Sequence, residues 1–244
     1  KQYSKLSPIF PQFIVPLQPA MDYGIDRAVF RRRASRITVA AHLFGILAII
    51  LLLVWLVHYR EGIELDSDQA YRIFNVHPFL MLAGFVFLSG EAMMAYKTVP
   101  AERGVQKFLH MFFNLTALCL GIVGIHAVFK FHDKENIVDM YSLHSWIGMG
   151  TFCFFILQWL FGFALYMFPK AAARTRASSL PWHICGGRAL LYMAICAAET
   201  GLMEKVTFLE LHHTRESRLI NFTGLAILLF GLSVDLSISL ARYV

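Results

Sequence analysis

Residues 74–96 read FNVHPFLMLAGFVFLSGEAMMAY, an almost uninterrupted apolar run with a histidine, His77, near its start. An α-helix rises about 1.5 Å per residue, so about 20 residues are enough to cross a hydrocarbon core of about 30 Å. Comparable runs occur elsewhere along the chain. They cover residues 37–58, 108–129, 141–168, 182–203 and 219–240. The sequence therefore predicts six membrane-spanning segments.

The composition supports the same class of protein. Of the 244 residues, 57% are hydrophobic, whereas soluble domains contain roughly 45 to 50% even with glycine counted. A segment inside lipid must satisfy its own backbone hydrogen bonds, and the runs lack the alternation of barrel strands, so they predict helices. We expect an all-α membrane protein with a six-helix domain over residues 37–244. Residues 1–36, which contain four prolines, predict an extended cytoplasmic arm.

The distribution of basic residues predicts the orientation. The side of the membrane that holds the arm carries twice as many lysines and arginines as the other side. The positive-inside rule therefore places both termini in the cytoplasm. The net charge of +6 comes from residues at the ends of the apolar runs rather than from a basic patch, so we expect no nucleic-acid partner.

Four consecutive apolar segments each carry a histidine in about their first turn, namely His77, His110, His144 and His183. Antiparallel segments alternate in direction, so His77 and His144 share one side of the membrane and His110 and His183 share the other. Two facing imidazoles on different helices are typical of a bis-histidine haem site. The pattern predicts two stacked haems, roughly 20 Å apart. Because both axial positions would be filled, we expect electron transfer rather than chemistry at the iron.

Other assignments remain open at this point. Histidines near helix ends are often interfacial residues. His42 competes as a ligand on the cytoplasmic side, and His58 and His126 compete on the other side. The chain has four cysteines, all inside apolar runs, and no CxxC or CxxCH motif, so any haem would be held by axial ligands and packing alone.

Glycines and acidic residues inside the apolar runs have two readings. The glycines would let a flat macrocycle approach the helices, or would serve ordinary helix packing; they are Gly84, Gly90, Gly121, Gly124, Gly148, Gly150, Gly186 and Gly187.

Intramembrane carboxylates are functional candidates because their burial is costly. For Glu91, Glu199 and Asp235 we favour solvation at the membrane interface over a proton relay.

Several motifs resemble the cytochrome b561 family of the plant vacuolar type. They are VWLVHYREG at residues 54–62, FNVHPFLM at 74–81, YSLHSWIG at 141–148, LPWH at 180–183 and the pair Glu204 and Lys205. The resemblance extends from about Ile37 to the C-terminus. It implies a transmembrane oxidoreductase, an ascorbate-dependent ferrireductase or monodehydroascorbate reductase, which passes electrons from cytosolic ascorbate to monodehydroascorbate or ferric chelates on the far side.

The resemblance also implies cofactors and ligands. Two non-covalent b haems would lie in a core of the second to fifth helices, in a chain that is usually a homodimer. The family's ligands correspond to His77 with His144 and to His110 with His183, which are the pairs that helix direction gives. A vacuolar membrane or another endomembrane is expected, with the plasma membrane as the alternative.

The substrate residues implied by the resemblance lie on both sides. Cytosolic ascorbate would dock at Lys97, Arg103 and Lys107, with Arg103 and Lys107 acting on the donor, and a second loop adds Arg174 and Arg176. Ascorbate is a monoanion at neutral pH, so basic loops would concentrate it. On the far side the acceptor site corresponds to the stretch from Lys130 to His132, to Tyr141 and to Glu204, with His132 binding the acceptor.

Two departures from the family pattern stand out. Members commonly have an asparagine before the position of His132, where this chain has Phe131, and the arm before Arg31 is longer than expected. Two other functions remain alternatives. A di-haem anchor subunit of a respiratory dehydrogenase would need a soluble partner, and a small-solute transporter would be colourless; no inverted repeat is evident.

Overall fold

The computed structural model describes the backbone of residues 23–240 and the side chains of residues 35–240, and every regular element in this part of the chain is helical. In chain order the elements are α1 (Tyr23–Val54), η1 (Trp55–Tyr59), α2 (Ala70–Phe79), η2 (Leu80–Leu88), α3 (Ser89–Thr98), α4 (Arg103–Glu135), α5 (Leu143–Tyr166), α6 (Ala173–Phe208) and α7 (Arg215–Leu240). The two η elements are π-helical turns. The element η1 continues α1 without a break, and η2 connects α2 to α3, so each set forms one continuous rod.

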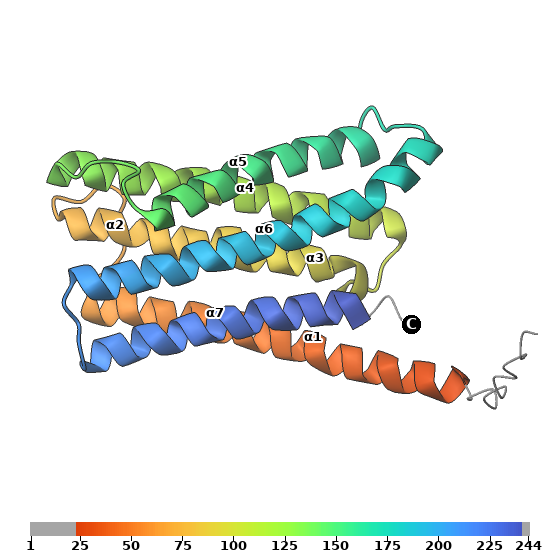
Figure 1. The fold of residues 1–244 in the computed structure, drawn as a ribbon, viewed down its shortest axis with the longest axis horizontal. Coiled ribbons are helices and arrows are strands. Elements are labelled where there is room, and N and C mark those ends of the chain that lie inside the picture. The colour runs from red at the N-terminus through yellow and green to blue at the C-terminus, as the bar shows by residue number, and fades with distance from the viewer. Residues whose placement is uncertain (1–22, 241–244) are drawn as a thin grey trace, which may run out of the picture.

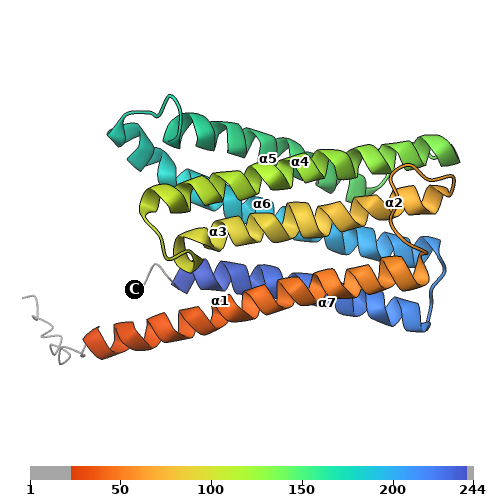
Figure 2. The ribbon, with the colours of Figure 1, turned by 180° about the vertical axis from the view of Figure 1, so that it is seen from behind.

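Consecutive rods run antiparallel along the long axis of the bundle and are joined by short loops at its two ends (Figure 1). We call the end where α1 begins and α7 ends the proximal end, and the opposite end the distal end. The rods α4 and α6 begin at the proximal end, whereas α2 and α5 begin at the distal end. Seen from behind, α1 and α7 lie side by side on one flank of the bundle, and α4 and α5 lie on the other (Figure 2).

Five helical segments of the described chain are long and apolar enough to cross a membrane. They are Ser35–Tyr59, Ala70–Thr98, Arg103–Glu135, Leu143–Tyr166 and Arg215–Leu240. Each overlaps one of the runs predicted from the sequence. The remaining predicted run, residues 182–203, lies within α6, which is helical throughout but more polar because Arg188 and Glu199 interrupt it.

Pro78 explains the change of helix type inside the second rod. Proline has no N–H to donate, and its ring clashes with the carbonyl group four residues earlier. The helix continues through Pro78 and then widens into η2, where each bond spans five residues instead of four. The wide turns begin at Leu80, three residues after His77.

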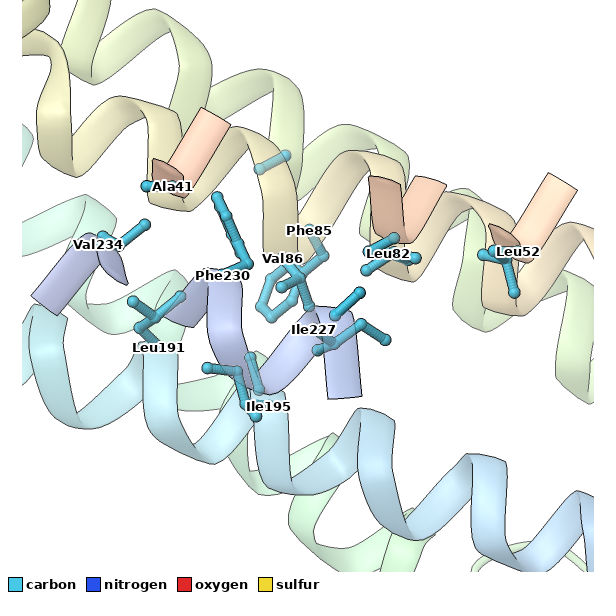
Figure 3. Packing of buried hydrophobic residues seen from close by; sticks show 14 of the residues in the cluster. Ala41, Leu52, Leu82, Phe85, Val86, Leu191, Ile195, Ile227, Phe230 and Val234 are labelled. Atoms are coloured by element: carbon cyan, nitrogen blue, oxygen red, sulfur yellow. The ribbon is translucent and has the colours of Figure 1, made fainter. Parts of the chain in front are cut away.

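The buried core lies where α1, η2, α6 and α7 meet (Figure 3). Phe230 of α7 is only 1% exposed and lies among apolar side chains from these rods. Its ring reaches α3 at Gly90, where a Cβ atom would lie 2.4 Å from Cζ of Phe230. Because lipid is as apolar as leucine, rods in a membrane associate through such close packing.

Polar contacts tie α1 to α7 at both ends of the bundle. At the distal end Glu216 accepts hydrogen bonds from Nε1 of Trp55 (2.7 Å) and from Nε of Arg60 (2.6 Å). Near the proximal end the hydroxyl groups of Thr38 and Ser237 are 2.5 Å apart. These buried bonds fix the two flanking rods relative to each other.

The expected N-terminal arm differs from the structure in one respect. We predicted an extended arm over residues 1–36, but α1 already begins at Tyr23. The prolines of the arm all precede Tyr23, and residues 23–54 contain none, so nothing interrupts the helix there. The rest of the predicted arm, residues 1–22, lies outside the described residues.

Candidate functional site

Two pairs of imidazoles lie between the rods. His77 of α2 faces His144 of α5, and their ring centroids are 6.1 Å apart. His110 of α4 faces His183 of α6, also with centroids 6.1 Å apart. Each histidine lies in the early turns of its rod, so the first pair lies towards the distal end and the second towards the proximal end. The structure thus brings together the same pairs that helix direction gives.

The spacing within each pair fits one metal ion between two rings. A metal–imidazole nitrogen bond measures about 2.0 to 2.1 Å, and the nitrogen lies about 1.1 Å from the ring centre, so two rings that face one metal ion in line have centroids about 6.2 to 6.4 Å apart. At 6.1 Å, both pairs lie close to this range. The planes of the two rings are 88° apart in the distal pair and 68° apart in the proximal pair.

The hydrogen bonds of the rings leave the right nitrogen available. In three of the rings Nδ1 donates to a main-chain carbonyl oxygen. His77 donates to Gly124 (3.0 Å), His110 to Ala92 (2.7 Å) and His144 to Ala197 (2.8 Å). A neutral imidazole that donates from Nδ1 offers the lone pair of Nε2 to a metal. Metal-bound histidines are usually oriented in this way. The orientation of His77, His110 and His144 therefore fits haem ligands, whereas the partner of Nδ1 in His183 is the amide nitrogen of Gln158, at 3.2 Å.

Two glycines make room for imidazoles. A Cβ atom on Gly201 would lie 2.7 Å from Cε1 of His144, and one on Gly162 would lie 3.0 Å from Cε1 of His183. Neither glycine was singled out from the sequence. Of those that were, Gly121 faces the ring of Phe152 and therefore serves helix packing, whereas a Cβ at Gly148 would meet no atom within 4 Å.

The competing histidines do not form imidazole pairs within the described residues. Nδ1 of His42 lies 2.8 Å from a carboxylate oxygen of Glu91. His58 packs edge-on against its neighbour Tyr59 at 4.9 Å, and His126 is exposed. The geometry therefore favours the four histidines of the two pairs over these three.

A cavity of about 880 Å³ lies beside the proximal pair, and both His110 and His183 line it. Four of the five basic residues assigned to the donor from the resemblance line it as well, namely Lys97, Arg103, Lys107 and Arg176. Arg174 does not. The cavity joins an apolar interior to a basic mouth, because its other walls include Phe155, Trp159 and Phe163.

Several of these cations are held by neighbouring groups. Nζ of Lys107 donates to the carbonyl oxygen of Tyr166 (3.4 Å), and the Arg103 guanidinium lies 5.1 Å from the ring centroid of Tyr96. Nζ of Lys97 donates to Oγ of Ser237 (3.0 Å). Neither Lys107 nor Arg103 forms a salt bridge in the described structure, so both charges remain available to an anion.

The residues assigned to the acceptor lie at the distal end and form short polar links. Nδ1 of His132 lies 2.8 Å from Oδ1 of Asp139. Lys130 donates to Asp66 at 2.9 Å, and this bond lowers the pKa of the Asp66 carboxyl group. Partial burial, together with the negative charge of Glu204, raises the pKa of Tyr141.

A chain of aromatic contacts connects this end to the distal imidazole pair. The ring of His132 contacts Phe131 (5.8 Å between centroids), Phe131 contacts Phe74 (5.1 Å), and Phe74 contacts His77 (6.3 Å). Nζ of Lys205 lies 3.7 Å from the ring centroid of Phe74. No sequence pattern indicates this cation–π contact, because it joins residues that are far apart in the chain.

Two of the three intramembrane carboxylates, Glu91 and Asp235, are paired rather than solvated at the membrane interface, which corrects our prediction for them. Glu91 contacts His42, and Asp235 accepts a hydrogen bond from Nη2 of Arg188 at 2.9 Å. The side chains of Glu91 and Asp235 are only 16% and 13% exposed. Oε1 of Glu199 is buried without a hydrogen-bond partner in the structure.

Long apolar antiparallel helices with imidazoles paired across their interfaces define an integral membrane protein of the cytochrome type. Residues 76–209, which include all four paired histidines, match the model of the eukaryotic cytochrome b561 family. The chain belongs to this family.

Curated relatives match most of the chain. It is 42% identical over 207 residues to the probable ascorbate-specific transmembrane electron transporter 1 of Oryza sativa subsp. japonica, covering 83% of this chain and 88% of the relative. It is 40% identical to the transmembrane ascorbate ferrireductase 1 of Arabidopsis thaliana, covering 86% and 89%. A plasma membrane ascorbate-dependent reductase of Xenopus laevis is 39% identical over 79% of this chain and 70% of its own length.

Proposed function

We propose that this chain is a transmembrane oxidoreductase that carries electrons from ascorbate on one side of a membrane to monodehydroascorbate or a ferric chelate on the other. The observation that carries the proposal is the placement of two imidazole pairs towards opposite ends of one bundle, each with centroids 6.1 Å apart. Ascorbate as the donor is supported by the names of the relatives, which are ascorbate-specific electron transporters and ascorbate ferrireductases.

We assign one non-covalent haem b to each imidazole pair. His77 and His144 would hold the distal haem, and His110 and His183 would hold the proximal one. A haem with two histidine ligands supplies reversible one-electron exchange between ferric and ferrous iron without an open coordination position. The protein's part is to orient the rings, which the carbonyl groups bonded to Nδ1 do for three of the four.

The proposal includes α6 as a sixth membrane crossing. At 36 residues, α6 is about 54 Å long, which exceeds the hydrocarbon thickness of about 30 Å. It packs between α5 and α7 (Figure 1), and its Arg188 is neutralised by Asp235. The α2–η2–α3 rod, α4, α5 and α6 would then form the four-helix core that holds both haems.

The proximal cavity is proposed as the donor site on the cytoplasmic side, with both termini in the cytoplasm. Ascorbate is a monoanion at neutral pH, so Lys107 and Arg103 attract it and orient it towards His110 and His183. Lys97 and Arg176 complete the basic lining. Arg174 does not line this cavity and serves at most in long-range attraction.

The distal end is proposed as the acceptor site. His132, Tyr141 and Glu204 supply a ring nitrogen, a phenolic hydroxyl and a carboxylate, which suit either an ascorbyl radical or a chelated metal ion. Phe131 stands where family members commonly have an asparagine, and its ring lies between His132 and Phe74. This apolar substitution disfavours a hydrogen-bonded acceptor at that position. A homodimer in a vacuolar or other internal membrane, with the plasma membrane as the alternative, completes the proposal.

The decisive experiment is a haem count combined with reduction by ascorbate. Purified protein in detergent should contain two haems per chain by pyridine haemochrome, and ascorbate alone should reduce them. A dehydrogenase anchor would instead need its soluble partner. In the variant with alanine at both His110 and His183, ascorbate should no longer reduce the remaining haem rapidly. Fast, complete reduction of that variant, or fewer than two haems in the wild type, would overturn the proposal.

A further inference from the structure

One of the four paired histidines is held differently from the others. In His77, His110 and His144 the partner of Nδ1 is a main-chain carbonyl oxygen. In His183 the partner is a side chain: the amide nitrogen of Gln158 lies 3.2 Å from Nδ1. The same amide nitrogen donates to the carbonyl oxygen of His183 at 2.7 Å. Gln158 therefore contacts both the ring and the backbone of this one residue.

The helices are shaped to receive the Gln158 side chain. It projects from α5 towards α6, where a Cβ atom on Gly186 would lie 3.1 Å from its Oε1 and one on Gly187 would lie 3.7 Å from its Nε2. Gly162, one turn further along α5, leaves the space that the His183 ring fills. Two glycines on α6 thus accommodate the amide, and one glycine on α5 accommodates the ring.

A side-chain amide differs chemically from the main-chain partners of the other rings. A carbonyl oxygen can only accept, and substitutions do not change it. A glutamine amide has an acceptor end and a donor end, and a half-turn of the group exchanges them. An imidazole that offers Nε2 to a metal carries its proton on Nδ1, so it needs the acceptor end, Oε1. With Nδ1 protonated the amide must therefore turn, and the bond from its nitrogen to the carbonyl oxygen of His183 is exchanged for a bond from Nδ1 to Oε1. The hydrogen bonding of His183 is therefore set by a group that can both turn and be replaced.

We infer that Gln158 is the positioning residue for His183 and sets the donor strength of this imidazole, so that the proximal haem is the one whose redox properties depend on a side chain. This inference rests on the proposed function. A stronger acceptor on Nδ1 makes the imidazole more basic and stabilises ferric iron, whereas loss of the acceptor does the opposite. The neutral amide of Gln158 is a weaker acceptor than a carboxylate, so its effect on the basicity of the imidazole lies between that of a carboxylate and that of no acceptor.

Two substitutions test the inference in opposite directions. Gln158→Glu places a carboxylate at Nδ1 and should lower the midpoint potential of one of the two haems. Gln158→Leu has a similar volume but no acceptor, and should raise the potential of the same haem. The other haem should titrate as in the wild type in both variants. The low-spin ferric electron paramagnetic resonance signal of the affected haem should shift as well.

Gln106→Leu provides the matched control. Gln106 lies in α4, which also begins at the proximal end, and its amide donates to the carbonyl oxygens of Val99 (2.9 Å) and Tyr96 (3.4 Å) rather than to an imidazole. Its loss removes a glutamine amide from the same region without touching a histidine pair. Both potentials should stay at their wild-type values.

The outcomes separate this inference from the function on which it rests. Unchanged potentials in both Gln158 variants, shifts in the same direction, or equal shifts of both haems overturn it, while two haems in the wild type leave the proposed function standing. Loss of one haem from Gln158→Leu but not from Gln158→Glu supports it, because only the acceptor was removed. Loss from both counts against it, since Gln158 would then act through packing alone. Fewer than two haems in the wild type overturn both proposals.

Discussion

Gly201 of α6 lies so close to His144 of α5 that a methyl group at residue 201 would reach to within 2.7 Å of Cε1 and 2.9 Å of Nδ1 of the imidazole. We therefore expect Gly201→Ala to displace His144 and to lower the haem content from two towards one per chain. Alanine favours helices by about 1 kcal/mol over glycine, so α6 itself should not suffer. The measurement is a pyridine haemochrome assay on purified protein.

The control for this change is Gly104→Ala, where the added Cβ atom would meet no atom within 4 Å. It should keep the full haem content. Equal haem content in the two variants would show that the close packing of Gly201 against the ring does not hold His144 in place.

Gly90 and Phe230 offer a test of core packing. A Cβ atom on Gly90 would lie 2.4 Å from Cζ and 2.8 Å from Cε1 of Phe230. Overpacking of this kind typically costs about 1 to 3 kcal/mol, so Gly90→Ala should lower the unfolding temperature in detergent. Adding Phe230→Leu should recover part of that loss. If the double variant is less stable than the sum of the two single changes predicts, the two residues do not clash as described.

The lining of the cavity predicts that two basic residues of the proximal end, Lys107 and Arg174, differ in their effect on the KM for ascorbate. Lys107 lines the cavity and Arg174 does not. Removal of one hydrogen bond to a charged group costs about 1.5 kcal/mol or more, so Lys107→Gln should raise the KM for ascorbate about tenfold. Arg174→Gln should change it less than twofold once salt screens long-range attraction. Steady-state reduction kinetics at two salt concentrations provide the measurement, and similar KM values for the two variants would contradict the assignment.

The raised pKa of Tyr141 predicts that the effect of Tyr141→Phe on the acceptor KM does not depend on pH. Its pKa is raised above the ordinary value of 10.0 by partial burial and by the charge of Glu204. A raised pKa keeps the hydroxyl protonated, and so able to donate, at every pH below that value. The ratio of acceptor KM values between Tyr141→Phe and the wild type should therefore exceed one and stay constant from about pH 6 to about pH 9. A ratio that falls towards one above about pH 8 would show that the phenol ionises in this range.

The sequence identified the paired histidines because their positions follow from two simple rules. The direction of successive helices fixes which histidines share an end, and the position in the first turns fixes their depth. These rules group His77 with His144 and His110 with His183, and the structure adds the helix rotation that makes the rings of each group face each other. The basic lining of the proximal cavity followed from the charge asymmetry and the resemblance.

The contacts that support the histidines could not be read in the same way. Gln158, Gly162 and Gly201 depend on the rotation of α5 and α6 about their axes, which packing against neighbours decides. Lys205 reaches Phe74 from a different rod, and nothing near it in the chain indicates that contact. Pairing of Glu91 with His42 and of Asp235 with Arg188 was missed because hydropathy alone places carboxylates near interfaces.

The π-helical segment η2 determines how far the side chains of α3 are rotated about the rod axis relative to those of α2. His77 lies before η2, and Ala92, whose carbonyl group orients His110, lies after it. Each wide turn holds more residues than an α-turn, so the segment determines which way the second half faces relative to the first. Deleting one residue within 80–88 would turn Ala92 by about 100° away from His110 while His77 stays in place. One short irregular stretch thus keeps His77 of one imidazole pair and the main-chain partner of the other pair in fixed register along a single helix.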